Sequence, residues 1–107
     1  MNVQNKQLII KAIIKVINSA PTLYPQNNIN YTQSSQRNDI TLNELNIWVN
    51  YANQILDISY QSIPLDIILT TEIEISQVSS QGIGSYLNRV ERIKGILLNL
   101  AQIIMQY

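Results

Sequence analysis

Apolar residues recur at alternating intervals of three and four from residue 83 to residue 107. This spacing places them on one face of an α-helix, because 3.6 residues make one turn. The stripe predicts a long helix over residues 85–106. Such a stripe is stable in water only when another element covers it, so the chain must supply further packed elements. The residues of the stripe are Ile83, Tyr86, Val90, Ile93, Leu97, Leu100, Ile104 and Tyr107.

A second helix is predicted over residues 41–60 by the signals at its N-terminus. Thr41 is a good N-cap residue and Glu44 stands three residues later, which is the spacing of a capping box. Ile40 precedes the cap and Leu45 falls at the fourth helical position, so a hydrophobic staple can form as well. These local signals all point to the same starting residue.

The N-terminal part of the chain predicts another helix, over residues 3–19. Isoleucines there follow helical spacing, and Pro21 ends the pattern. Residues 22–39 are rich in Asn, Gln, Ser and Tyr, so they are predicted to form a long loop.

Residues 65–78 fit two structures. The alternation of Ile67, Leu69, Thr71, Ile73 and Ile75 is typical of a half-buried strand. The spacing of Leu65, Ile68, Leu69, Ile73 and Ser76 is also that of a helical face. A strand needs a partner, and no other segment has a convincing strand pattern, so we favour a helix and keep the strand as the alternative. The predicted fold is then all-α: a single domain over residues 1–107, built as a four-helix bundle with a long first loop.

Two residue types that carry much of protein chemistry are missing, since the chain has no cysteine and no histidine. Thiolate nucleophiles, cysteine zinc sites and the commonest general base are thereby excluded. Charged residues make up 13% of the chain and the formal net charge is zero, which gives no field to steer it toward nucleic acid or an anionic membrane. We expect no cofactor, no metal, no nucleic-acid or membrane partner, and a cytoplasmic location.

One acidic cluster supports an alternative interpretation as a minimal metal-dependent nuclease or hydrolase, built on Asp66, Glu72 and Glu74. Such a site needs carboxylates that converge on a hard cation. On a helix Glu72 and Glu74 diverge by about 200°, because each residue advances roughly 100°. We therefore favour a solvated face and a protein that is not an enzyme.

Two sets of residues are predicted to have different roles in the bundle. Trp48 lies on the most apolar line of its helix, which favours a core position over a place in an interface. The apolar stripes are wider than a four-helix interior needs, so part of that surface is expected to bind another protein. The predicted core anchors are Leu45, Trp48, Ile55, Ile93, Leu97 and Leu100, and the predicted interface residues are Leu87, Ile96, Ile103, Tyr24 and Tyr31.

The stretch Leu45-Asn46-Ile47-Trp48 and the Leu/Ile-rich stretch 89–104, RVERIKGILLNLAQII, together resemble small helical accessory domains of bacterial conflict (anti-phage defence) systems. The resemblance implies an adaptor that binds an effector protein or oligomerises with it. The expected function is thus a non-enzymatic protein–protein interaction module that self-associates or assembles with a larger effector. An inhibitor from a phage or mobile element, masking a host protein, is the alternative within the same class.

Overall fold

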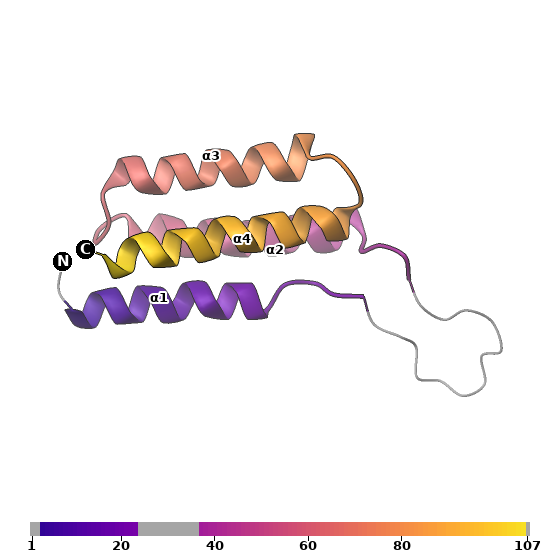
Figure 1. Ribbon diagram of the computed structural model, residues 1–107. Helices are drawn as coiled ribbons and strands as arrows, with labels where there is room; N and C mark the ends of the chain where they lie inside the picture. Colours follow the sequence, from indigo (N-terminus) through magenta and orange to yellow (C-terminus); the bar gives the residue numbers. More distant parts are fainter. Residues whose placement is uncertain (1–2, 24–36, 107) are drawn as a thin grey trace, which may run out of the picture.

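Four α-helices make up the fold in the computed structural model, which describes residues 3–23 and 37–106. Each helix runs antiparallel to the one before it (Figure 1). The all-α prediction is confirmed, and the described residues contain no strand. Residues 65–78 lie within a helix, so the alternative strand does not form. The helices are α1 (Val3–Asn18), α2 (Leu42–Ser59), α3 (Leu65–Gln81) and α4 (Tyr86–Met105).

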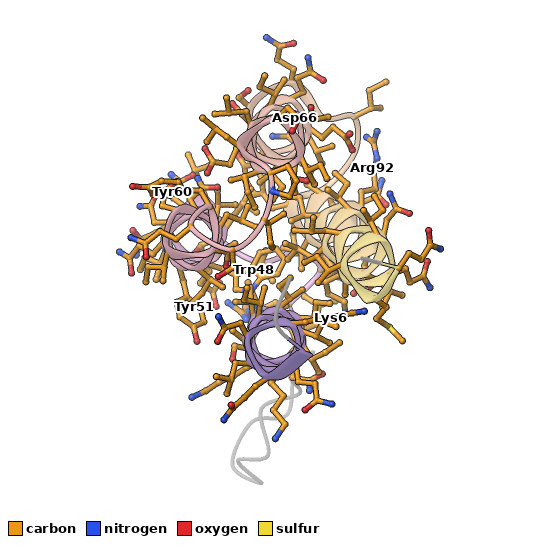
Figure 2. All side chains as sticks on the ribbon, turned by 90° about the vertical axis from the view of Figure 1, so that its left-hand side faces the viewer. Lys6, Trp48, Tyr51, Tyr60, Asp66 and Arg92 are labelled. Carbon is orange, nitrogen blue, oxygen red and sulfur yellow. The ribbon has the colours of Figure 1, made fainter. Side chains whose placement is uncertain are left out.

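Viewed along the bundle axis, the helices occupy four corners (Figure 2). α1 and α3 face each other across one diagonal, and α2 and α4 across the other. α1 packs against α2 and α4 and has no contact with α3. The outer faces of α1 and α3 therefore lie on different sides of the molecule.

The core is aliphatic with one tryptophan, which points between the helices toward the bundle axis (Figure 2) and lies beside the C-terminal end of α1. The Trp48 side chain is 3% exposed, and its Nε1–H donates a hydrogen bond to the carbonyl oxygen of Val16, 2.8 Å away. This bond satisfies the single polar atom of the indole, so the ring can be buried without an unpaired donor. Among the predicted core anchors Ile55 is half-buried, and Leu45, Trp48, Ile93, Leu97 and Leu100 are buried.

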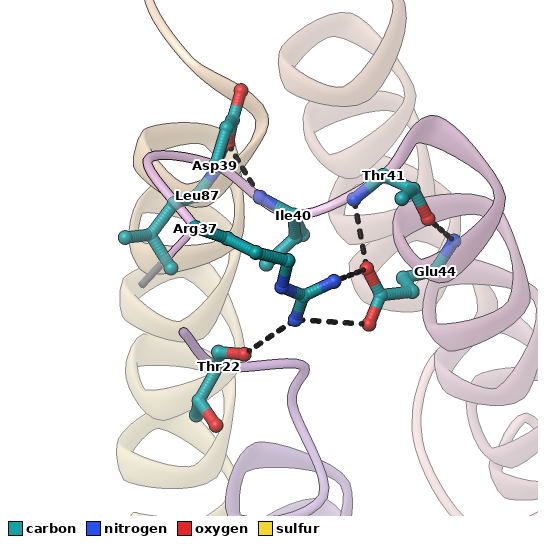
Figure 3. A network of polar contacts seen from close by, with 7 residues as sticks. All are labelled: Thr22, Arg37, Asp39, Ile40, Thr41, Glu44 and Leu87. Atoms are coloured by element: carbon teal, nitrogen blue, oxygen red, sulfur yellow. Dashed lines mark hydrogen bonds and ion pairs between the residues drawn. The ribbon is translucent and has the colours of Figure 1, made fainter. Parts of the chain in front are cut away.

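The predicted capping box at the start of α2 is present. The Thr41 hydroxyl accepts from the Glu44 backbone N–H at 3.0 Å, and the Glu44 carboxylate accepts from the Thr41 N–H at 2.8 Å (Figure 3). Arg37 donates to the same carboxylate at 2.7 Å and to the Thr22 carbonyl at 3.1 Å. The hydrogen bond from Arg37, more than any other contact, holds the pKa of Glu44 below its ordinary value. These contacts join the two described ends of the first connection.

Asp39 links the first connection to the start of α4. Its two carboxylate oxygens accept from the backbone N–H groups of Tyr86, at 2.8 Å, and Leu87, at 2.6 Å. These donors belong to the first turn of α4, where backbone N–H groups have no partner within the helix and the helix dipole favours a negative charge. Desolvation raises the pKa of Asp39, but its backbone hydrogen bonds and the Arg89 charge together lower it below the ordinary value.

Replacing this cap should destabilise the bundle. Ser85 is the N-cap residue of α4, and Asp39 adds a second, charged acceptor for its first N–H groups. We therefore expect Asp39→Ala to lower the free energy of unfolding by about 1–2 kcal/mol, as loss of a capping side chain usually does. Asn38→Ala, a change at the exposed neighbouring position, is the matched control and should change it by less than about 0.5 kcal/mol. Thermal unfolding followed by circular dichroism measures both, and equal effects of the two changes would contradict the capping role.

Candidate functional site

Helix α3 carries apolar residues on two of its faces. Its inner stripe, Ile67, Thr71 and Ile75, lies toward the core. An outer stripe repeats the same four-residue spacing but starts two residues earlier, so it lies about 200° away around the helix. The outer side chains are 54%, 48% and 56% exposed, which is unusual for three large apolar residues in a line. They are Leu65, Leu69 and Ile73, named here the α3 row.

A carboxyl pair, Asp57 of α2 and Glu72 of α3, lies beside the α3 row. Glu72 directly precedes Ile73 and comes three residues after Leu69, so it borders the row on the side of α2. Burial, followed by the hydrogen bond and the negative charge of Asp57, raises the pKa of Glu72 from 4.5 to about 7. Two carboxyl groups share a hydrogen bond only while one of them keeps its proton.

The carboxyl pair has no cationic partner within the described part of the chain. The ion pairs found there join Arg37 to Glu44 and Lys94 to Glu91. The Glu72 Oε1 atom is buried and receives no hydrogen bond from any described residue. A buried acceptor without a donor is unfavourable, and a cationic group from outside the chain that approaches the exposed Asp57 would stabilise the negative charge of the pair.

Charge is divided among the helices although the whole chain is neutral. α2 and α3 contain no lysine or arginine, and α1 contains no aspartate or glutamate. The acidic residues are Glu44 and Asp57 on α2 and Asp66, Glu72 and Glu74 on α3, and the basic residues of α1 are Lys6, Lys11 and Lys15. The α2–α3 side of the bundle is therefore acidic and α1 is basic.

The arginines of α4 are directed toward α3 and so do not extend the basic surface of α1. Arg89 donates to the Ser79 carbonyl of α3 at 3.2 Å, and its guanidinium lies 5.1 Å from the centre of the Tyr86 ring. Arg92 lies on the side of α4 that faces α3 (Figure 2), where it lines a groove together with Glu74. Lys94 is paired with Glu91 of its own helix at 3.2 Å.

The predicted interface residues on α4 are more enclosed than the α3 row. Leu87 and Ile96 are half-buried and pack against the core. Ile103 is half-buried too, and with Ile96 it lines a groove of about 160 Å³ between α3 and α4. Tyr24 and Tyr31 lie outside the described residues.

Another apolar groove runs between α1 and α2. It contains a hollow of about 320 Å³ lined by Leu8, Ile9, Ile55 and Ile58, together with polar side chains. Ile47 lines a further hollow beside Trp48, between α2 and the segment that follows α1. Ile58 and Ile47 are 72% and 61% exposed, so this side of the bundle is a second candidate interaction surface besides the α3 row.

The acidic residues of the nuclease interpretation do not gather at one point. Asp66 and Glu74 line the α3–α4 groove, whereas Glu72 faces Asp57 on the side of α2. Within residues 3–23 and 37–106 no group of three or more acidic side chains is arranged to hold a metal ion. In the same residues, no helix combines the length and apolar character needed to cross a membrane.

No family model, curated protein or solved structure is significantly similar to this chain. The candidate site therefore rests on the residues described above.

Sequence reasoning missed both the α3 row and the carboxyl pair. A signal for the row was available, since Leu65, Leu69 and Ile73 are spaced four apart. No sequence signal exists for the pair, because Asp57 and Glu72 come from different helices and meet only when α2 and α3 pack.

Proposed function

We propose that this chain is a non-enzymatic protein–protein interaction module that binds through the α3 row and the adjoining face of α2. The observation that carries the proposal is the exposure of Leu65, Leu69 and Ile73 in one line on a helix whose inner face already fills the core. Large apolar residues that are aligned and exposed are typical of a surface that another protein covers. The partner is a second copy of the chain or a larger effector protein.

The energetics of the row are consistent with an interface. Covering the exposed half of each side chain contributes roughly 1 kcal/mol per residue. The carboxyl pair beside the row gives the surface a polar feature that can select a partner. Tyr60 adds an aromatic side chain, 52% exposed, at the end of α2 (Figure 2).

A double substitution in the row tests this proposal. Leu69→Gln with Ile73→Gln keeps good helix formers in place while removing apolar surface, so the fold should persist. We expect the double variant to lose assembly. Light scattering measures the mass of the purified chain, and the size of the native complex that contains the chain is measured in cell extract. Circular dichroism should show unchanged helix content.

The control is Ile47→Gln, which removes an exposed isoleucine of α2 on the side of α1. This control should assemble as the unchanged chain does. Loss of assembly in the control alone would move the interface to this side of α2, and unchanged assembly in the α3 variant would refute the proposal.

A further inference from the structure

We propose that the surface covering the α3 row is helix α1 of a second copy of this chain. This inference rests on the proposed function and names its partner. In the contact, the outer face of α1 lies along the α3 row, and its lysines meet the carboxyl pair of the neighbouring copy.

Helix α1 presents a matching outer line. Leu8, Lys11 and Lys15 follow one another at intervals of three and four, and all three side chains are exposed. We name these residues the α1 line. Neither of the ion pairs in the described residues involves α1, so the ammonium groups of Lys11 and Lys15 remain available for a second molecule.

Charge complementarity favours a second copy as the occupant. The carboxyl pair borders an apolar row on a side of the bundle that has no basic residue in α2 or α3. The α1 line combines two lysines with an exposed leucine on a helix that has no acidic residue. A lysine ammonium can donate to the exposed Asp57 carboxylate, and its positive charge then also stabilises the adjoining Glu72.

The two surfaces also match in length. The α3 row runs from Leu65 to Ile73, eight residues further along the helix, or about 12 Å at 1.5 Å per residue. The α1 line runs from Leu8 to Lys15, seven residues further along the helix, or about 10 Å. One helix laid against the other can therefore bring the apolar and charged parts of both into register.

The contact joins two different surfaces, so it is heterologous. α1 and α3 stand at opposite corners of the bundle and do not touch (Figures 1 and 2). A copy that donates its α1 line still has a free α3 row. The association therefore continues from copy to copy and gives a ring if the rotation closes or a filament if it does not.

Two variants test the contact, each with one of the two surfaces disrupted. Lys11→Glu with Lys15→Glu removes the α1 line but leaves the α3 row intact, whereas Leu69→Gln with Ile73→Gln does the reverse. By light scattering at low ionic strength, the unchanged chain should exceed the mass of a dimer and each variant alone should stay monomeric. An equimolar mixture of the two variants should form a dimer. The lysine variant keeps its α3 row, and the glutamine variant keeps the α1 line that binds to it.

Charge controls accompany the mixing experiment. Lys11→Arg with Lys15→Arg keeps both positive charges and should assemble as the unchanged chain does. Raising the ionic strength from about 0.05 to 0.5 M should raise the dissociation constant roughly tenfold, since exposed charges are screened. Circular dichroism checks that each variant retains its helix content.

Three results would overturn the inference. Assembly of the Lys11→Glu, Lys15→Glu variant would show that α1 is not the occupant, and a mixture that stays monomeric would show that the contact is not heterologous. A monomeric unchanged chain at low ionic strength would exclude a second copy. A different result would refute the proposed function: complexes of the chain in cell extract that keep their size after the Leu69→Gln, Ile73→Gln change.

Discussion

Trp48→Ala should remove about 3–5 kcal/mol from the free energy of unfolding, the usual cost of deleting a large buried aromatic side chain. The indole is 3% exposed and lies among side chains of the core, so its removal leaves a cavity between α1 and α2. Domains of this size are stable by only about 5–15 kcal/mol, so the variant should lose a large share of its stability. Urea unfolding followed by circular dichroism measures the loss, because the variant has no other tryptophan to report by fluorescence.

Trp48→Phe separates the volume of the ring from its hydrogen bond. The phenyl ring fills much of the site but cannot donate to Val16, whose carbonyl still accepts from the Ser19 N–H. We expect a cost of about 1–2 kcal/mol, between the unchanged chain and Trp48→Ala. An alanine variant that loses less than about 1 kcal/mol would contradict the buried position of the indole.

Helix boundaries were predictable where the chain carries local signals. The expected ranges 3–19, 41–60 and 85–106 agree with α1, α2 and α4 to within a residue at each end. Capping bonds and proline act within a few residues along the chain, so they can be read without knowledge of the tertiary structure.

The alternation of apolar and polar residues in 65–78 has a physical explanation that only the structure makes clear. Ile67, Thr71 and Ile75 form one stripe spaced by four, and Leu65, Leu69 and Ile73 form another, offset by two. Together they place an apolar or β-branched residue at every second position, which imitates a strand. Of the helical face expected from the sequence, only Ile68 is buried, because α3 turns its other stripe toward the core.

Which flank of α4 remains open could not be read from its sequence. Periodicity identifies Ile93, Leu97 and Leu100 as the line of α4 that faces the core. It does not say which neighbouring helix covers each side of that line. In the bundle α3 and α1 lie on either side of α4, so Ile96 and Leu87 become half-buried. The outer face of α3 stays uncovered because of the order in which the helices pack, which the sequence of a single helix does not reveal.

The stability of the bundle should fall as the pH rises from 5 to 8, and Glu72 is the cause. Its pKa is about 7 in the folded chain and 4.5 ordinarily, so between these values the folded state holds a proton that the unfolded state has released. Stability decreases with pH wherever the folded state binds more protons. The decrease begins near pH 4.5 and is complete above pH 7.

Glu72→Gln provides the test, because glutamine keeps the size of the side chain and cannot ionise. Urea unfolding at a series of pH values, at protein concentrations too low for assembly, should give a falling free energy for the unchanged chain and a nearly flat one for the variant. Glu74→Gln is the matched control, since Glu74 is exposed on the same helix and its replacement should leave the slope in place. Two parallel curves for the unchanged chain and Glu72→Gln would show that the carboxyl pair is not what makes the stability depend on pH.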